Sequence, residues 1–241
     1  MIEDQEKRLV TTSLKALIVV TSHDKMGGTG KETGFYYEEM AVPYWALMDA
    51  GLDVRIASMK GGLPPHDPES LHVAGKSKAS VDRFLACPSA VAKLQDTQKL
   101  ESVDPRDFAL VFLAGGHGTM WDFAQSEMLG RLVGQAYDSG AIIGAICHGV
   151  AGLLGARRYD GRPLVEGMRI NSFTNAEEEA AGLTGVVPYL VESRLRELGA
   201  KFESAPNFQP KVVRDGRIIT GQNPQSAELV ASELIAALRL R

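Results

Sequence analysis

The segment between Ala141 and Leu154 constrains the fold of this chain more than any other part of the sequence. Its residues, AIIGAICHGVAGLL, begin with an apolar run typical of a buried strand, and those after the Cys147–His148 pair are small and apolar, as in a closely packed helix. Ala145 and Gly149 stand two positions before and after Cys147. Small residues at this spacing indicate a nucleophile elbow, because the sharp turn from strand to helix brings the flanking residues together. We therefore expect a strained backbone at Cys147 and a side chain raised above the sheet.

The two cysteines of the chain stand in different surroundings. A helix that begins at Cys147 would direct its free N–H groups and the positive end of its dipole at the sulfur, and both favour thiolate, the reactive form of cysteine. We therefore predict that Cys147 is a functional thiol with a pKa below that of a free thiol. Cys87 has no neighbouring histidine and no preceding strand, so we interpret it as a cysteine that only packs in the core.

The composition limits the classes of protein to which the chain can belong. Its 241 residues, of which 44% are hydrophobic, suffice for one sizeable core, so we expect a single domain over residues 1–241. The net charge is −4 and no basic run occurs, which argues against nucleic acid as a partner. The first apolar run, residues 14–20, is too short to cross a membrane. The N-terminus is rich in charge and is followed by no secretory signal, so we expect a reducing, cytoplasmic location.

Strand-like and helix-like segments alternate along the chain. Strands are predicted at residues 15–21, 53–58, 108–113 and 141–146, and helices at 36–50, within 80–99, at 127–138, at 188–198 and from 223 onwards. A hairpin is predicted at 212–220. This order predicts a three-layer α/β/α sandwich with a mainly parallel, flavodoxin-like sheet. The glycine-rich segment 26–31 lacks the spacing of a phosphate-binding or dinucleotide-binding loop, so we interpret it as a flexible loop at the active site.

Ligands of parallel α/β sheets bind at the carboxyl ends of the strands, where two unusual segments of this chain occur. One is the Cys147–His148 pair, and the other is GGHG at 115–118, whose glycines let backbone N–H groups approach an anionic oxygen. We expect Gly116 and His148 to donate their N–H groups to that oxyanion, although glycines also serve simply to make a tight turn. His117 is either a second acid–base group or a loop residue.

Two further groups of residues admit a functional interpretation. Three large apolar residues could contact a ligand: they would line a substrate pocket or a surface that binds unfolded proteins. Residues of this kind more commonly pack in the core. They are Trp45, Met120 and Trp121. Four potential metal ligands match no helical or hairpin ligand spacing, so we predict no metal site; they are His66, Asp67, Glu69 and His72.

Two neighbouring carboxylates lie in the helix predicted at 36–50. Helical periodicity gathers the large apolar residues of this helix on one face and leaves Glu38 and Glu39 away from it. On this ground alone, either residue is interpreted as a solvated carboxylate.

Five motifs together carry a family resemblance that covers nearly the whole chain. They are TGFYYEEMAVP at 33–43, GGHG at 115–118, AICHG at 145–149, SFTNAEE at 172–178 and GQNPQSA at 221–227. With them the chain resembles the ThiJ/PfpI superfamily, which has a class I glutamine amidotransferase-like fold. Within it, the chain is similar to the branch of heat-shock chaperones and glutathione-independent glyoxalases (glyoxalase III). Glutamine amidotransferases place their triad histidine well after the cysteine, and no histidine follows His148 here, so that reaction is disfavoured.

The resemblance implies roles for four residues. Cys147 would be the nucleophile and His148 its partner. The carboxylate of the family follows a Thr-Gly pair by five positions and precedes a proline by four, which selects Glu39; it would hydrogen-bond to the Cys147 thiol and shuttle protons. Glu178 would orient His148, although it is one of three adjacent glutamates, Glu177–Glu179, and carboxylates favour the start of a helix in any case.

The resemblance also implies a cofactor-independent glyoxalase. A Cys147 thiolate would add to the aldehyde of methylglyoxal or a similar 2-oxoaldehyde, Glu39 or His148 would move a proton between the two carbons, and water would release a 2-hydroxy acid such as D-lactate. This chemistry requires neither a metal nor a cofactor. Two alternatives stay open: a cysteine amidase or peptidase, and a stress-response chaperone with unfolded proteins as clients. The resemblance further implies a homodimer.

Overall fold

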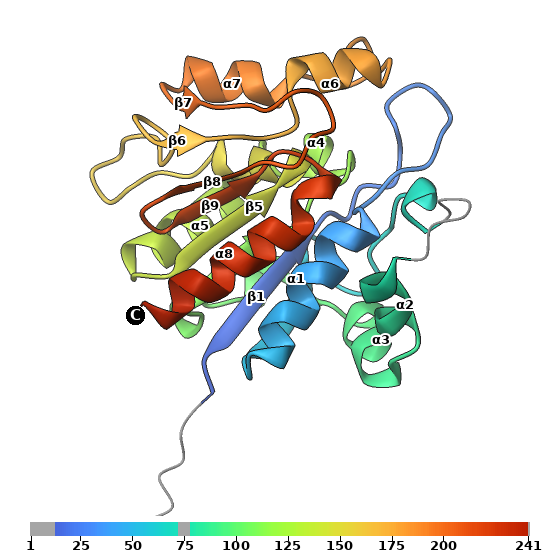
Figure 1. Ribbon diagram of the computed structural model, residues 1–241, viewed down its shortest axis with the longest axis vertical. Coiled ribbons are helices and arrows are strands. Elements are labelled where there is room, and N and C mark those ends of the chain that lie inside the picture. The colour runs from blue at the N-terminus through green and yellow to red at the C-terminus, as the bar shows by residue number, and fades with distance from the viewer. Residues whose placement is uncertain (1–12, 72–77, 241) are drawn as a thin grey trace, which may run out of the picture.

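The central sheet has seven strands in the order β3-β2-β1-β4-β5-β9-β8, of which only β8 and β9 pair antiparallel. The structure is a computed structural model that describes residues 13–71 and 78–240 (Figure 1). The strands are β1 Lys15–Val20, β2 Asp53–Ser58, β3 Gln98–Lys99, β4 Leu110–Leu113, β5 Ile142–Ile146, β8 Val212–Asp215 and β9 Ile218–Gly221. The charged N-terminus and His72, which entered the sequence analysis, lie outside the described residues.

Helices cover both faces of this sheet. They are α1 Tyr37–Asp49, α2 Ala79–Leu85, α3 Pro88–Gln95, α4 Thr119–Asp122, α5 Glu127–Asp138, α6 Asn175–Ala180, α7 Val191–Glu197 and α8 Ala227–Arg239. Short 3₁₀ helices are η1 Pro68–Ser70, η2 Leu100–Ser102, η3 Pro105–Asp107, η4 Cys147–Leu153 and η5 Pro224–Ser226. A small parallel pair, β6 Arg169–Ile170 and β7 Lys201–Phe202, lies with α6 and α7 beyond the β8–β9 edge (Figure 1). No described helix is long and apolar enough to cross a membrane.

The buried residues form two cores, one on each face of the sheet. In β1, Ile18 and its alternate neighbours belong to one core, while Leu17 and Val19 belong to the other, because successive side chains of a strand point to opposite faces. Helices α1 and α8 lie side by side over the first face (Figure 1). Helix α5 packs in the second core. The predicted three-layer α/β/α sandwich is therefore confirmed.

Several predicted boundaries are corrected by the structure. The helix expected from Pro188 begins at Val191, because Leu190 before it has an extended backbone and is the N-cap of the helix. The segment after the nucleophile is a 3₁₀ helix rather than an α-helix. The sequence analysis did not predict β3, β6 and β7, because strands of two residues carry no measurable periodicity.

The turn after β5 has the geometry of a nucleophile elbow. Cys147 has a φ angle of 55°, in the left-handed region that side chains other than glycine rarely adopt. Two residues later, a Cβ atom on Gly149 would lie 2.4 Å from the carbonyl oxygen of Leu113 in β4. The turn can therefore pack against the end of the neighbouring strand only because this position has no side chain.

We predict that Gly149→Ala destabilises the protein by about 1–3 kcal/mol, the usual cost of overpacking a core. The added methyl group meets backbone of β4, which cannot move aside as a flexible side chain does. The measurement is the free energy of unfolding in denaturant. Gly28→Ala is the matched control, because a Cβ atom at that position meets nothing within 4 Å. Equal stability of the two variants would contradict the close approach of η4 to β4.

Candidate active site

The carboxyl ends of β4 and β5 bring the predicted nucleophile against Gly115 of the GGHG motif. The Cys147 side chain is only 4% exposed. A Cβ atom on Gly115 would lie 3.0 Å from the Cys147 Cβ atom, and one on Gly116 would lie 2.3 Å from the carbonyl oxygen of Gly34. Gly116 also has a φ angle of 111°. The GGHG motif thus both makes a tight turn and clears space beside the sulfur; the oxyanion role of Gly116 stays a prediction.

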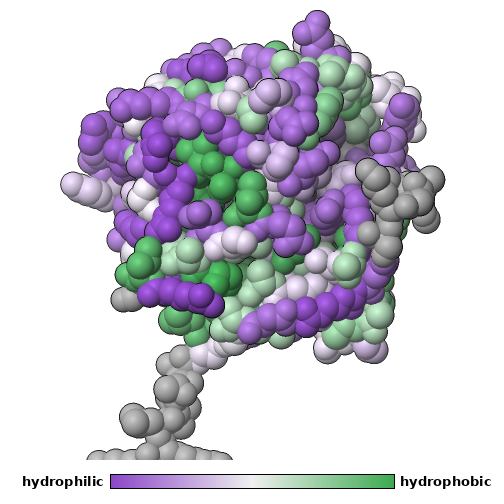
Figure 2. Space-filling view, in the orientation of Figure 1, coloured by the Kyte–Doolittle hydropathy of each residue, from purple (hydrophilic) through white to green (hydrophobic). Residues whose placement is uncertain are grey.

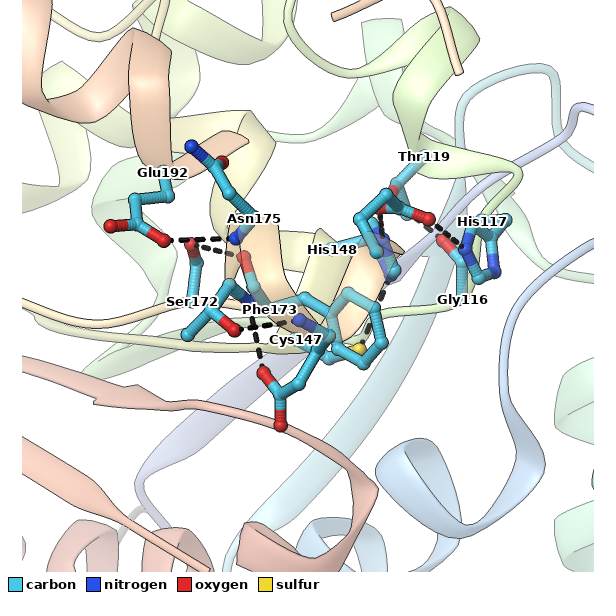
Figure 3. A network of polar contacts seen from close by, with 12 residues as sticks. Gly116, His117, Thr119, Cys147, His148, Ser172, Phe173, Asn175 and Glu192 are labelled. Atoms are coloured by element: carbon cyan, nitrogen blue, oxygen red, sulfur yellow. Dashed lines mark hydrogen bonds and ion pairs between the residues drawn. The ribbon is translucent and has the colours of Figure 1, made fainter. Parts of the chain in front are cut away.

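Glu178 holds two histidines at once. Its Oε2 atom lies 2.7 Å from His148 Nε2 and its Oε1 atom lies 3.0 Å from His117 Nε2. Figure 3 shows the imidazoles of His117 and His148 near one another, with the Cys147 sulfur beside His148. Because an ionised carboxylate only accepts hydrogen bonds, both Nε2 atoms are assigned as donors. The Nδ1 atom of His148 is then free to accept a proton from Cys147 Sγ, 3.3 Å away.

The ionisation of this group follows from its surroundings. Burial, joined by the charge of His117, lowers the pKa of His148. Burial would raise the pKa of Glu178, but the charges and hydrogen bonds of His148 and His117 outweigh it and lower that pKa to about 2. Glu178 is therefore a carboxylate at neutral pH, as a residue that orients an imidazole has to be.

Glu39 lies on the other side of the thiol. Its side chain is fully buried, and the Cys147 thiol and the Gly115 N–H are the polar groups that face it. Neither of its oxygens meets a partner with standard hydrogen-bond geometry among the described residues. Burial raises the pKa of Glu39 to about 8. At neutral pH this residue therefore holds a proton, which it can share with the sulfur.

The sequence-based prediction for the thiol pKa is wrong for the resting site. Burial, followed by the negative charge that Glu39 can carry, raises the pKa of Cys147 well above that of a free thiol, although the His148 N–H acts in the opposite direction. The expected helix-dipole effect is outweighed because the sulfur lies in the core next to a carboxylate. Cys147 and Glu39 are best treated as one pair that titrates together.

The neighbouring Glu38 has different surroundings. Its carboxylate forms an ion pair with Lys78 at 2.6 Å and is partly exposed. Lys78 also donates to the Tyr36 hydroxyl, 3.2 Å away. Of the two adjacent glutamates, the structure thus places only Glu39 beside the sulfur, as the spacing of the family motif implies.

The three adjacent glutamates of α6 also differ in their surroundings. Glu177 is buried and forms a capping box with Thr174, whereas Glu179 is exposed. Glu178 alone contacts the two histidines.

Three large apolar residues of the sequence analysis make their contacts with other segments of the chain. Trp121 stacks on His23 with ring centroids 5.0 Å apart and an angle of 12°. A Cβ atom on Gly27 would lie 3.5 Å from this indole, so the glycine-rich loop packs beside it. Met120 is fully buried in the core. Trp45 packs against the first core and donates its indole N–H to the Ser80 carbonyl.

Cys87 combines core packing with a partly exposed thiol. It packs against the first core, as predicted. Its sulfur also lies 3.3 Å from the Ser89 hydroxyl, and this contact, with backbone N–H groups at the start of α3, lowers the pKa of Cys87. Reagents for thiols will therefore compete between the two cysteines, and experiments on Cys147 need a Cys87→Ser background.

The sequence analysis overlooked Phe173. Its ring lies 4.5 Å from the ring of His148, and its N–H contacts the carbonyl oxygen of Cys147 at 3.5 Å. The only signal was its place in the SFTNAEE motif, beside the glutamates.

The described residues contain one group of side chains that could hold a metal ion. The ligand atoms of His117, His148 and Glu178 lie within 4.8 Å of one another. However, the two rings lie face to face with a tilt, with centroids 4.0 Å apart and an angle of 38° between their planes. Each Nε2 atom therefore points at its own carboxylate oxygen, whereas a metal ion needs the lone pairs to converge on one point. The arrangement suits hydrogen bonding better than coordination, and the expected lack of a metal stays a prediction.

We predict that the rate of alkylation of Cys147 by iodoacetamide, in a Cys87→Ser background, rises with pH with a midpoint on the alkaline side of that of a free thiol. Burial and the negative charge that Glu39 acquires above about pH 8 both disfavour the thiolate, so thiolate is scarce at neutral pH. A midpoint well on the acid side of neutrality would instead support the thiolate that the sequence alone predicts.

Comparison with known proteins agrees with this architecture. The sequence pattern of the DJ-1/PfpI family matches residues 32–237. Glyoxalase 3 of Candida albicans is 30% identical over 234 residues, which cover 93% of this chain and 98% of that protein.

Two solved structures are also similar. The crystal structure of glyoxalase III from Candida albicans has a TM-score of 0.86 and 28% identity, covering 93% of this chain and 97% of that one. Rapid Encystment Protein 24 kDa of Francisella tularensis has a TM-score of 0.88 and 37% identity, covering 93% and 99%. Since the family pattern spans most of the residues and the folds agree over nearly the full length, the chain belongs to the DJ-1/PfpI family.

Proposed function

We propose that this protein is a cofactor-independent glyoxalase that converts methylglyoxal or a similar 2-oxoaldehyde into a 2-hydroxy acid such as D-lactate. The observation that carries the proposal is the position of one buried sulfur between two proton carriers, Glu39 and His148. A relative that covers nearly the same length is named a glyoxalase. Cys147, His148, Glu39 and Glu178 are the residues to which we assign the chemistry.

The proposed reaction begins with addition of the Cys147 sulfur to the aldehyde carbon. The thiol proton passes to His148 Nδ1, which lies 3.3 Å from the sulfur. The backbone N–H groups of Gly116 and His148 stabilise the former carbonyl oxygen, and Glu39, which is protonated near neutral pH, donates its proton to this oxygen to complete a hemithioacetal. A base then removes the hydrogen from this carbon, which gives an enediol, and a proton is delivered to the neighbouring carbon. We assign this transfer to the Glu39 carboxylate that the first proton donation leaves, because the neutral form that it regains is stable near neutral pH and can deliver the proton to the neighbouring carbon.

The second half of the proposed reaction uses water. Proton transfer leaves the 2-hydroxyacyl group bound to Cys147 as a thioester. Water then attacks the thioester carbonyl, the carbon–sulfur bond breaks, and the sulfur regains a proton. The sum adds one water to the oxoaldehyde, with no net oxidation, so the chemistry needs only a nucleophile and acid–base groups.

Burial of the site supports a small substrate. Cys147, His148 and Glu39 are almost completely inaccessible, and a peptide bond held in an extended chain is much harder to bring to such a sulfur than a three-carbon aldehyde. Burial therefore disfavours the peptidase alternative, whereas an amidase that acts on small amides stays an alternative to the glyoxalase.

The chaperone alternative needs an exposed apolar surface for unfolded proteins. Figure 2 shows apolar areas that hydrophilic side chains interrupt in this view. The most exposed large apolar residues, Leu63, Tyr159 and Leu240, belong to separate segments of the chain. Chaperone activity and a homodimer stay expectations from the family resemblance, and a cytoplasmic location stays an expectation from the sequence.

We predict that Cys147→Ser abolishes formation of D-lactate from methylglyoxal in the absence of glutathione and added metal, while the fold is retained. The hydroxyl group has a similar size but does not ionise near neutral pH, so it cannot replace the thiolate. The measurement is an enzymatic assay of D-lactate with purified protein. Cys87→Ser is the matched control and should retain activity. Turnover by the Cys147→Ser variant would rule out the covalent mechanism.

We predict that Glu39→Gln lowers kcat by about 10²–10⁴-fold, the usual loss when an acid–base group is removed, whereas Glu38→Gln has little effect. Glutamine keeps the shape of the side chain but cannot carry the proton. The reverse order in steady-state kinetics would contradict the assignment.

We predict that Glu39→Gln changes the pH dependence of the free energy of unfolding. The pKa of Glu39 is about 8 in the folded protein, against 4.5 for an unperturbed glutamate, so its protonated form stabilises the fold fully below pH 4.5, and this stabilisation is lost as the pH rises to about 8. Glu39→Gln therefore gains stability relative to the wild type over that range. Denaturant unfolding at several pH values measures this difference.

A further inference from the structure

A second buried carboxylate lies next to the site and takes no part in the proposed reaction. Glu177 is 0% exposed. Its Oε1 atom accepts hydrogen bonds from the Phe208 N–H at 2.8 Å, from Asn223 Nδ2 at 2.8 Å and from Gln222 Nε2 at 3.1 Å. Its Oε2 atom accepts from the Thr174 N–H at 2.9 Å. A buried carboxylate with four donors is held in one place, and it holds its donors in turn.

These hydrogen bonds join three segments that are distant in the sequence. They are α6, which carries Glu178, the loop between β7 and β8, and the GQNPQSA motif after β9. Gln222 exchanges two further hydrogen bonds with the backbone of Ala205, and Asn223 donates to the carbonyl oxygen of Gln209. The proposed reaction gives this motif no task, and the structure shows that it fixes the loop on both sides of Phe208.

Phe208 itself is held in an unfavourable conformation. Its φ angle is 59°, in the left-handed region, and its side chain is 41% exposed. A bulky residue keeps such a conformation only where its surroundings impose it. The hydrogen bond from its N–H to the Glu177 carboxylate is the contact that does so.

The rings next to Phe208 lead directly to the catalytic histidine. The centroid of Phe208 lies 6.3 Å from that of Phe173, and the centroid of Phe173 lies 4.5 Å from that of His148. Figure 3 shows Phe173 beside Cys147 and His148. These two phenylalanines, which we call the aromatic wall, therefore form one side of the site, with Phe208 as its outer support.

We propose that Glu177 is a positioning residue for the aromatic wall, and that through Phe208 it sets the size of the aldehyde that can reach Cys147. The assignment to 2-oxoaldehydes rests on the proposed function, while the size limit concerns the site whatever its reaction. We expect the aromatic wall to admit methylglyoxal to the sulfur and to exclude an oxoaldehyde that carries an aromatic ring.

The isosteric amide cannot replace this carboxylate. Glutamine has one acceptor oxygen and one NH₂ group. In one orientation, the oxygen of the glutamine side chain faces the donors of Phe208, Gln222 and Asn223, and its NH₂ group faces the Thr174 N–H. In the reverse orientation, the oxygen accepts from the Thr174 N–H, and the NH₂ group faces the other three donors. Either way a buried donor loses its partner, and the loop that carries Phe208 loosens.

The first test measures access to the sulfur without any enzyme assay. In a Cys87→Ser background, Cys147 is the only thiol, and its alkylation rates by iodoacetamide and by 2-iodo-N-phenylacetamide are compared. We expect the ratio of the bulky to the small reagent to rise about tenfold in Glu177→Gln, the scale on which small changes in pocket space discriminate ligands. Phe208→Gly should give the same rise, because it removes the ring but keeps the N–H and tolerates the φ angle.

Two further variants make the test decisive. Glu179→Gln, an exposed neighbour on α6, is the matched control and should leave the ratio unchanged. Glu177→Asp keeps the charge but is one methylene shorter, so it decides the matter if Glu177→Gln fails to fold. An unchanged ratio in a folded Glu177 variant overturns the proposal, as does a change in Phe208→Gly alone.

The second test uses the proposed substrates. The ratio of kcat/KM for phenylglyoxal to that for methylglyoxal should rise in Glu177→Gln and Phe208→Gly by a similar factor. A merely structural defect lowers both values in proportion to the active fraction and leaves the ratio constant. If the wild type turns over neither aldehyde, the proposed function fails, whereas the alkylation ratio still decides the role of Glu177.

Discussion

The contact between a buried carboxyl group and a buried thiol is the interaction on which the rest of this site depends. Water stabilises neither group, so burial favours the neutral form of both and raises the pKa of Glu39 to about 8. Two acids that cannot both ionise share their protons, and the loss of one proton gives a pair in which the sulfur or the carboxylate carries the charge. Nucleophile and proton carrier are thus created by the same desolvation.

Residues that take no part in the reaction bring the carboxyl group and the thiol together. β4 and β5 end side by side, which brings Gly115 next to Cys147. The missing side chain at Gly115 leaves room for the Glu39 carboxyl, since a Cβ atom there would lie 2.2 Å from Glu39 Oε2. On the opposite side, Glu178 fixes His148. The two proton carriers therefore approach the sulfur from different elements.

Local sequence patterns predicted the strands and the nucleophile elbow better than they predicted the ionisation of the site. The continuous apolar runs of β1, β4 and β5 and the small residues around Cys147 identified the sheet and the elbow, because those signals lie within a few neighbouring residues. Helical periodicity gave Glu39 no special place, since its burial comes from Gly115 and Cys147, which are distant in the sequence, and only the family motif selected it. The thiol pKa was predicted in the wrong direction for the same reason: the helix start is local, whereas desolvation is tertiary. Nothing local indicated that Phe208 is held by Glu177.

Infrared difference spectroscopy of the Glu39 carboxyl group as a function of pH tests the shared proton most directly. The account predicts a C=O band of a protonated carboxylic acid at neutral pH that disappears with a midpoint near 8, and that is missing from the spectrum of Glu39→Gln. A carboxylate at Glu39 throughout the neutral range, with no such band to lose, would contradict the central claim that the thiol and the carboxyl group share one proton.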